Sequence, residues 1–323
     1  MACILITGAN GFLGSEIVRQ LAGTCLGIRA ADKQEESIFP GIDYRPADIL
    51  EPASLVSVVQ GADCVMHAAG LAHIFDKTKA INAPFKAVNE IGTANVAQAA
   101  AKAGVKHFIL VSSVSVYGGS REGGHEESGF HPEGPYAESK YQAELRAIEI
   151  AKASGMALTI LRLATLYGEG DPGNVARLMR SIDRGRFIWI GNGSNHKSLL
   201  HREDAARACL VVAQHPASGV NIYNVSAPPC SMRDVVQGLA LALGKPVPTW
   251  HIPGSLTLAV AGMASAVAGG KGRLGNLRAT LQKWLADDVY DAGKFEQAFD
   301  FKTQVNLADG LRREAVGGKD VER

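Results

Sequence analysis

The chain has 323 residues, of which 46% are hydrophobic and 20% are charged, and its formal net charge is +1. This length exceeds the usual size of one compact core, so we expect one large α/β domain with a smaller companion. The balanced charge excludes a general attraction to nucleic acid or to anionic membrane, and any site for a polyanion must therefore be local.

The cysteines indicate neither a disulfide framework nor a metal site. There are five, at scattered positions and without a Cys-x-x-Cys pair: Cys3, Cys25, Cys64, Cys209 and Cys230. An odd, scattered set is typical of a protein kept in a reducing compartment. The opening segment MACILITGAN has too few apolar residues for a signal peptide. We therefore expect a cytoplasmic protein without a bound metal.

The first half of the chain alternates short β-branched runs with longer amphipathic segments. The pattern predicts strands at 3–7, 25–32, 63–70, 107–113 and 158–168, and helices at 12–23, 52–61, 85–104 and about 137–154. Such alternation implies parallel strand pairing through right-handed crossovers. The strands are apolar throughout, which indicates helices on both faces of the sheet. We therefore predict an α/β fold with a Rossmann-type, doubly wound parallel sheet.

The alternation of strands and helices ends at GEGDPGN, residues 168–174, where turn-forming residues follow the last predicted strand. We expect a first domain at 1–168 and a smaller second region at 169–323. The two should interleave, because residues 201–214 are patterned as a helix that could return to the sheet. We assign 201–226 to the first domain on that ground.

Residues 255–270, SLTLAVAGMASAVAGG, form an apolar stretch interrupted by Ser, Thr and Gly. The stretch is shorter than a membrane span, which needs about 20 apolar residues. We expect a buried or lid-forming helix here. A contact with a membrane surface and a pocket wall for an apolar substrate are alternatives that the sequence leaves open.

Three glycines lie directly between the first predicted strand and the first predicted helix: Gly8, Gly11 and Gly14. Glycines there permit a tight turn and a close approach of the backbone to a pyrophosphate at the helix N-terminus. Asp32 ends the second strand, where a carboxylate can bind an adenosine ribose and repel a 2′-phosphate. The pattern predicts NAD as cofactor. NADP stays possible, because Arg29 or Lys33 could pair with that phosphate.

Tyr136 and Lys140 lie four residues apart at the start of a predicted helix, so their side chains share one face. A phenol in water loses its proton only near about pH 10, and a neighbouring ammonium favours the phenolate. The pair is therefore a candidate acid and base.

Together with PYAESK at 135–140, the Gly-x-x-Gly-x-x-Gly spacing resembles the extended branch of the short-chain dehydrogenase/reductase superfamily, the NAD-dependent epimerase/dehydratase family. Further similar segments follow in order: ADIL (47–50), HAAG (67–70), VNEIGTANVAQAA (88–100) and VSSVSVYG (111–118). The resemblance implies that the cofactor is bound by Gly8, Asn10, Gly11, Phe12, Leu13, Gly14, Asp32, Lys33, Asp48, Ile49, Ala68, Ala69, Gly70, Asn89, Ser112, Tyr136 and Lys140. Asn89 would act by supporting the neighbouring strand.

The resemblance also implies the catalytic residues. Ser113, with Ser112 as the second choice, would hydrogen-bond the substrate oxygen, and Tyr136 would exchange a proton with that oxygen. Lys140 would hold the nicotinamide ribose and lower the pKa of Tyr136. Dehydratases of the family carry an Asp-Glu pair next along the chain. Val114 and Ser115 stand there instead, which argues against a dehydratase.

The substrate side of the chain departs from the pattern of nucleotide-sugar epimerases. Thr165 stands where they usually have Asn, Lys197 where they have Arg, and Arg202 where they have an apolar residue. Lysine offers a point charge without the bidentate fork of arginine. The candidate substrate contacts are Ser113, Thr165, Asn174, Arg177, Lys197 and Arg278, and we assign the region at 169–323 mainly to substrate binding.

We interpret the chain as an NAD(P)-dependent enzyme that acts by hydride transfer on a nucleotide sugar, through 4-epimerisation or 4-keto reduction. One alternative is a 3β-hydroxysteroid dehydrogenase-like oxidoreductase for an apolar alcohol or ketone, which the 255–270 stretch suggests. Another is a non-catalytic dinucleotide-binding regulator, against which the intact Ser113, Tyr136 and Lys140 argue. We expect no nucleic-acid partner, no membrane span, and a homodimer in which helices at 80–104 and 137–154 pair with their copies.

Overall fold

The structure is a computed structural model that describes residues 3–22, 24, 27–72, 82–118, 124–255, 257–259, 281–282 and 284–320. The candidate substrate residue Arg278 lies outside the described residues, as does most of the apolar stretch at 255–270. The expectations for these parts of the chain stay predictions.

The centre of the fold is a seven-stranded sheet with the order β11-β6-β5-β4-β1-β2-β3. All of its neighbouring strands pair in parallel. The strands are β1 (Cys3–Thr7), β2 (Gly27–Asp32), β3 (Asp43–Pro46), β4 (Cys64–His67), β5 (His107–Ser113), β6 (Ala157–Leu163) and β11 (Val220–Val225). The order reverses between β1 and β4, and ligands bind beyond the strand ends at such a switch point. The predicted doubly wound fold is confirmed.

Helices cover both faces of this sheet, and β1 shows how its residues divide between them. Ile4 and Ile6 belong to the core beneath α1 (Phe12–Leu21) and α7 (Arg202–Gln214). Leu5 points to the opposite core, beneath α2 (Pro52–Val59), α4 (Thr93–Lys102) and α5 (Pro135–Ser154). Successive side chains of a strand point to opposite faces, so an apolar run in β1 serves both layers.

The helix predicted at 85–104 is not a single regular helix. Its described part consists of α3 (Asn82–Phe85), a π-helical segment η1 (Lys86–Gly92) and α4. Within it, Gly92 lies against the Ile49 side chain so closely that an added Cβ would be 2.5 Å from Ile49 Cδ1. Hydrophobic periodicity does not distinguish these helix types, and π-helical turns often occur near functional sites.

The strand predicted at 158–168 divides into two. The main-sheet strand β6 ends at Leu163, and β7 (Thr165–Tyr167) pairs instead with β10 (Leu199–His201) in a separate two-stranded sheet. Between them the Ala164 amide donates to the Val225 carbonyl oxygen over 2.9 Å. The edge strand β3 was not predicted, because Asp43–Pro46 is short and polar.

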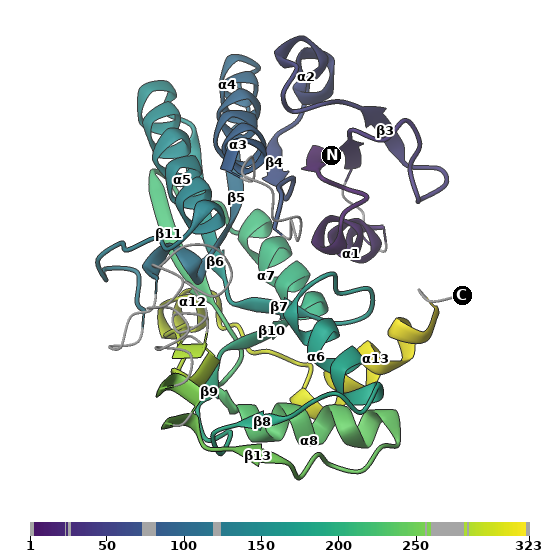
Figure 1. The fold of residues 1–323 in the computed structure, drawn as a ribbon. Helices are drawn as coiled ribbons and strands as arrows, with labels where there is room; N and C mark the ends of the chain where they lie inside the picture. The colour runs from purple at the N-terminus through teal and green to yellow at the C-terminus, as the bar shows by residue number, and fades with distance from the viewer. Residues whose placement is uncertain are drawn as a thin grey trace.

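The smaller region lies below the sheet in Figure 1 and has its own core. Its helices α6 (Asn174–Asp183), α8 (Met232–Leu243) and α13 (Leu307–Asp320) pack on one another. Two short two-stranded sheets accompany them: β8 (Trp189–Ile190) with β13 (His251–Ile252), and β9 (His196–Lys197) with β12 (Cys230–Ser231). The helix α12 (Gly293–Phe299) packs near β11. Within the described ranges, no helix has the length and apolar character needed to cross a membrane.

Candidate active site

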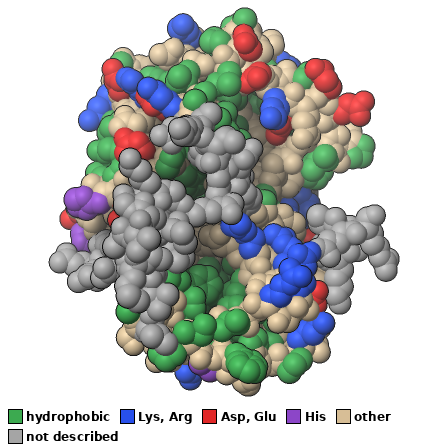
Figure 2. All heavy atoms as spheres, in the orientation of Figure 1, with side chains coloured by type: hydrophobic (Ala, Val, Ile, Leu, Met, Phe, Trp, Pro, Cys, Tyr) green, Lys and Arg blue, Asp and Glu red, His purple; other side chains and the backbone are tan. Residues whose placement is uncertain are grey.

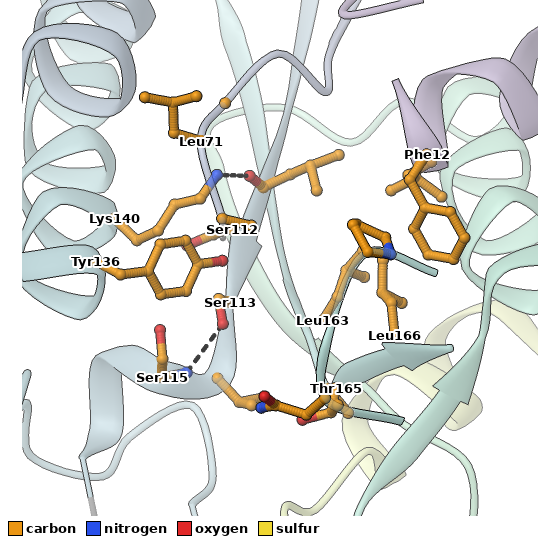
Figure 3. A pocket seen from close by; sticks show the side chains of 18 of the residues that line it. Phe12, Leu71, Ser112, Ser113, Ser115, Tyr136, Lys140, Leu163, Thr165 and Leu166 are labelled. Atoms are coloured by element: carbon orange, nitrogen blue, oxygen red, sulfur yellow. Dashed lines mark hydrogen bonds between the residues drawn. The ribbon is translucent and has the colours of Figure 1, made fainter. Parts of the chain in front are cut away.

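A cavity of about 690 Å³ lies at the carboxyl ends of the central strands. Figure 2 shows the surface hollowed between the upper and lower regions, and Figure 3 shows the side chains around the cavity. Of the predicted site residues, the cavity brings together Gly11, Phe12, Leu13, Gly14, Ala68, Gly70, Ser112, Ser113, Tyr136, Lys140, Thr165 and Asn174. Residues far apart in the sequence thus form one continuous wall.

The glycine loop has no room for side chains. Gly8 has a φ of +73°, and an added Cβ would lie 2.6 Å from the Ala69 backbone. A Cβ on Gly14 would lie 2.0 Å from the Gly8 carbonyl oxygen. The helix α1 follows at once, with no side-chain cap on its N-terminus. A bare loop leading into a helix N-terminus at the cavity wall fits the diphosphate of a dinucleotide.

Asp32 is held beside this loop by two backbone amides. Its Oδ2 accepts from Asn10 N over 3.1 Å and its Oδ1 from Lys33 N over 2.8 Å. Arg29, which could have paired with a 2′-phosphate, instead binds Asp43 over 2.8 Å and the Val58 carbonyl oxygen over 2.9 Å. With Arg29 bound there, Lys33 is the cation of the two named above that stays a candidate partner for a 2′-phosphate.

Several predicted residues support the cavity from outside its wall. Asn89 is buried and makes two hydrogen bonds with the Leu71 backbone. Its Oδ1 accepts from Leu71 N over 2.8 Å, and its Nδ2 donates to the Leu71 carbonyl oxygen over 2.9 Å. Ile49 packs on Gly92, and its carbonyl oxygen accepts from Asn95. The predicted residues that do not line the cavity are Gly8, Asn10, Asp32, Lys33, Asp48, Ile49, Ala69, Asn89, Arg177 and Lys197.

Tyr136 projects from the first turn of α5 toward Ser113 at the end of β5 (Figure 3). Pro135 occupies the first helical position, and the Phe85 ring packs edge-on against the Tyr136 ring at 5.9 Å. Burial raises the pKa of Tyr136, while a hydrogen bond with Ser113 acts in the opposite direction. The lowering of this pKa by Lys140, which the family resemblance implied, stays a prediction.

Lys140 follows one turn later on α5, and only 9% of it is exposed. Its Nζ donates to the Val111 carbonyl oxygen over 2.9 Å, and lies where a side chain on Gly70 would meet it at 3.3 Å. Burial lowers the pKa of Lys140 to about 8, and the Glu144 carboxylate opposes that shift. The lysine is therefore anchored at the cavity wall, and its ammonium loses a proton more readily than that of a lysine in water.

A buried polar network that the sequence analysis missed lies behind these residues. Ser112 Oγ donates to Glu144 Oε1 over 2.5 Å, and Glu144 pairs with Arg162 over 2.7 Å. Arg162 continues to the Tyr117 hydroxyl, which donates to Asn224 Oδ1; both distances are 2.8 Å. The signals for it are a lone arginine in an apolar strand and a glutamate one turn after Lys140. The network ties α5 to the ends of β5 and β6, where the catalytic side chains project.

The substrate end of the cavity carries carboxylates that the sequence analysis did not name. Thr165 and Asn174 line it, together with four carboxylates: Glu133, Asp171, Asp287 and Asp288. Lys197 lies beside this end, where its Nζ donates to the Ala286 carbonyl oxygen over 3.0 Å. Burial lowers the pKa of Lys197, and Asp288 and Asp287 oppose that shift. Arg177 lies on the exposed side of α6, outside the cavity wall.

Arg202, the departure noted at the start of α7, joins the two regions. Its guanidinium lies 5.0 Å from the centre of the Phe12 ring and donates to the Glu169 carbonyl oxygen over 2.6 Å. It also reaches Ser15 Oγ at 3.2 Å. Arg202 thus connects the helix that follows the glycine loop with the turn that begins the smaller region.

The histidines of the described part do not form a metal site. His67 is fully buried between the Thr7 and Thr93 hydroxyls, at 2.7 and 2.9 Å, and burial lowers its pKa to about 3. His201 is buried and packs edge-on against Tyr167. No group of three or more His, Cys, Asp or Glu residues with metal-binding geometry occurs among the described residues.

The sequence pattern of the NAD dependent epimerase/dehydratase family matches residues 4–226. The chain is similar to N-acetyl-alpha-D-glucosaminyl-diphospho-ditrans,octacis-undecaprenol 4-epimerase of Escherichia coli O157:H7, with 30% identity covering 96% of this chain and 93% of that protein. It is also similar to UDP-glucose 4-epimerase of Vibrio cholerae, with 31% identity covering 77% of this chain and 78% of that protein.

Among solved structures, UDP-glucuronic acid 4-epimerase from Bacillus cereus in complex with NAD has a similar fold. Its TM-score is 0.78 at 20% sequence identity, and the alignment covers 99% of this chain and 100% of that chain. At this identity the likeness concerns the fold, and it extends over both the sheet domain and the smaller region.

Proposed function

Because the chain belongs to the NAD-dependent epimerase/dehydratase family, we propose that it is an enzyme that epimerises or reduces C4 of a nucleotide sugar by hydride transfer with NAD. The observation that carries this proposal is the single cavity that joins the glycine loop to Ser113, Tyr136 and Lys140. A cofactor cradle and a proton-transfer group must face the same sugar carbon for this reaction, and one cavity supplies both.

The proposed cofactor contacts combine the family resemblance with the residues at the upper end of the cavity. The glycine loop and the N-terminus of α1 would hold the diphosphate, with Asp32 at the adenosine ribose and Asp48 and Ile49 near the adenine. Ala68, Gly70 and Lys140 would hold the nicotinamide riboside. When bound, NAD supplies hydride transfer at the sugar carbon.

The chain's own residues would transfer the proton and stabilise the charge that develops on the substrate oxygen. Tyr136 would take the proton of the C4 hydroxyl as that oxygen becomes a carbonyl, and return it in the reverse direction. Ser113 would hydrogen-bond the same oxygen, since its hydroxyl lies beside the phenol. Lys140 adds positive charge close by, so its protonation state would set part of the pH dependence of the reaction.

The proposed substrate contacts lie at the opposite end of the cavity. Thr165 and Asn174 line the cavity and would contact the sugar or the diphosphate. Lys197 would serve the diphosphate, because it lies at the same end beside Ala286. Arg177 would contribute only long-range charge from its exposed position on α6, and Arg278 stays a proposal from the sequence.

A second candidate substrate is a sugar diphosphate linked to a polyprenol. The relative from Escherichia coli O157:H7 is named for such a compound, and the match to it extends over nearly the whole chain. A sugar diphosphate is common to both candidates, so the cavity itself serves either. They differ in what lies beyond the diphosphate.

The test is turnover with NAD of UDP-glucose, UDP-N-acetylglucosamine and undecaprenyl-diphospho-N-acetylglucosamine, with a long-chain ketone and NADH as a further arm. Substrate labelled with deuterium at C4 separates the two reactions. An epimerase passes the label to the bound cofactor and returns it to the same carbon, with no net change of cofactor. A reductase working in the oxidative direction on these C4 hydroxyls passes the label to NAD and releases labelled NADH together with the 4-keto sugar. Failure of every sugar diphosphate, with turnover of the ketone, would replace this proposal by the apolar-substrate alternative.

We also propose a homodimer formed through α4 and α5, which lie side by side in Figure 1. Ile91 on η1 and Leu145 on α5 are large apolar side chains that are 47% and 42% exposed. A hollow between the helices, lined by Ala94, Gln98, Arg146, Glu149, Ile150 and Ala153, could receive side chains of a second copy. Light scattering at micromolar concentration tests this; a monomer mass for the wild-type chain would refute it.

The division into regions and the cellular compartment belong to the same proposal. β11 pairs with β6 and α7 packs on α1, which supports assigning 201–226 to the sheet domain at 1–168, with the rest of 169–323 mainly serving the substrate. The described cysteines Cys3, Cys64, Cys209 and Cys230 are free thiols. Buried free thiols suit a reducing compartment, and we propose the cytoplasm.

A further inference from the structure

The two-stranded ribbon of β8 and β13 has an apolar outer face. The strands pair in parallel with Trp189 opposite His251 and Ile190 opposite Ile252. Paired residues of parallel strands point to the same side, and alternate residues to the other. Trp189 is buried, so its side of β8 faces the core of the smaller region, while His251, which stacks on it, is exposed. The outer side therefore carries Ile188, Ile190, Trp250 and Ile252.

This outer face is exposed far more than apolar side chains usually are. Trp250 is 81% exposed, Ile188 51% and Ile252 39%. Val247, in the segment that leads into β13, is 42% exposed. Figure 2 shows hydrophobic side chains across the lower part of the molecule, where β8, β13 and α8 lie. A contiguous exposed patch of this kind marks an interaction site.

The charge around the ribbon is basic. Residues 183–191 and 244–254 contain Arg184, Arg186 and Lys245, against the single acidic residue Asp183. Asp183 pairs with Lys245 over 3.4 Å, and the formal charge of the two segments is about +2, in a chain whose total is +1. Tryptophan and branched aliphatic side chains flanked by Arg and Lys are typical of surfaces that enter the headgroup region of a bilayer.

The ribbon ends next to the substrate end of the cavity. Leu285 packs against the glycines that follow the two strands: a Cβ on Gly191 would lie 3.1 Å from Leu285 Cδ2, and one on Gly254 would lie 3.4 Å from Leu285 Cδ1. The next residues along the chain, Ala286, Asp287 and Asp288, line the cavity. A substrate tail that leaves the cavity here therefore meets Leu285 and then the ribbon.

We propose that the outer face of the β8–β13 ribbon docks the protein on the surface of an anionic lipid bilayer, with the substrate end of the cavity beside the headgroups. The choice of a lipid surface as occupant rests on the proposed function in its polyprenol-linked form. A substrate with a sugar diphosphate at the water interface and its chain in the bilayer would then be reached without leaving the membrane.

The test is cosedimentation of the full chain, with NAD present, with vesicles of phosphatidylethanolamine and phosphatidylglycerol, compared with vesicles of phosphatidylcholine alone. We expect binding to the anionic vesicles and a shift of tryptophan emission to shorter wavelength as Trp250 leaves water. Trp250→Ser and Ile252→Ser should each weaken vesicle binding about tenfold or more, because each removes apolar area from the contact. Arg186→Glu should weaken binding to the anionic vesicles most strongly at low salt.

Val56→Ser is the matched control, because Val56 on α2 is 64% exposed and lies in the sheet domain. It should leave vesicle binding unchanged. The ribbon variants should retain circular dichroism and turnover of a soluble sugar nucleotide, since these side chains are exposed and outside the cavity wall. Absence of vesicle binding by the wild-type chain, or binding that Trp250→Ser and Ile252→Ser leave unchanged, would overturn docking.

A fall in molecular mass caused by the ribbon variants, without vesicle binding by the wild type, would assign the face to a second copy and would also overturn the proposal. These outcomes are separable from the proposed function. Vesicle binding without turnover of any sugar diphosphate would remove the function and keep the docking surface. Turnover of a sugar diphosphate without vesicle binding would keep the proposed function and overturn the docking surface.

Discussion

The cofactor end and the substrate end of the cavity are built on different principles. The cofactor end consists of strand ends, a glycine loop and one helix face, and its buried charges include Lys140 and the Glu144–Arg162 pair. The substrate end consists of turns and short strands that carry carboxylates. Behind it Glu314 is buried, with Gly168 N donating to its Oε2 over 2.6 Å.

The difference shows which part of the cavity is fixed by the chemistry and which by the substrate. Hydride transfer requires one geometry of cofactor and proton donor, and rigid sheet elements hold such geometry best. Substrates vary, and loops on a rigid scaffold accommodate that variation. We therefore expect substitutions at the cofactor end to act on turnover and folding, and those at the substrate end to act on specificity and pH dependence.

The largest effect is expected at Tyr136. Tyr136→Phe should lower kcat by about 10²–10⁴-fold, the usual loss when a proton-transfer group is removed. NAD binding and thermal stability should be retained, because only one hydroxyl is lost. Turnover measured beside a fluorescence titration with NAD checks both parts. Near-wild-type turnover would show that another group moves the proton.

Next in size is Glu144→Ala, which tests whether the network behind the cofactor end is essential. The substitution leaves the Arg162 guanidinium buried without its carboxylate, and we expect a loss of about 3–5 kcal/mol in the free energy of unfolding. Chemical denaturation measures it. Glu149→Ala on the same helix is the control, because Glu149 is an exposed partner of Arg146 and should change stability by less than about 0.5 kcal/mol. Equal effects of the two substitutions would contradict the assigned role.

Glu314 should make the stability of the substrate end depend on pH in the acidic to neutral range. Burial, with Asp171 nearby, raises its pKa from 4.5 to about 8. A carboxyl whose pKa is raised on folding stabilises the fold fully below its unfolded pKa, and this contribution is lost as the pH rises through the folded value. Stability should therefore fall between about pH 4.5 and pH 8.

Glu314→Gln should remove this dependence, so that between pH 5 and pH 7 the variant gains on the order of 2 kcal/mol relative to wild type. Denaturant unfolding at the two pH values measures the difference. Glu296→Gln, at an exposed position on α12, is the matched control and should follow the wild type. If Glu314→Gln kept the wild-type pH dependence, another group would be its source.

The smallest expected effect concerns cofactor choice at Asp32. Asp32→Ala should narrow or invert the preference for NAD over NADP, because it removes the charge that repels the 2′-phosphate. We expect the ratio of the NADP and NAD dissociation constants to fall by about tenfold. Asp32→Asn keeps an acceptor for the loop amides, so it separates loss of charge from loss of loop support. Dissociation constants for both cofactors give the ratio. Tighter binding of NADP by the wild-type chain would contradict the role of Asp32.

Local sequence patterns accounted for much of the sheet domain. β1 and β5 occur at the predicted residues, because their apolar runs are short and bounded by turn signals. The glycine loop and the Tyr136–Lys140 pair are also local, since both depend on spacings of a few residues. The division of residues 158–168 between two sheets could not be predicted from a local pattern. It depends on β10 and β11, which come much later in the chain.

The sequence by itself determined the parallel α/β architecture, the family and the positions of the candidate catalytic side chains, because hydrophobic period and motif spacing are properties of neighbouring residues. Only the tertiary structure decided that Glu144 meets Arg162, that Arg29 is occupied by Asp43, and that the β8–β13 ribbon ends beside the cavity at Leu285. These contacts join segments distant in the chain, and their partners are selected by packing and by the need to pair buried charge, which no local pattern records.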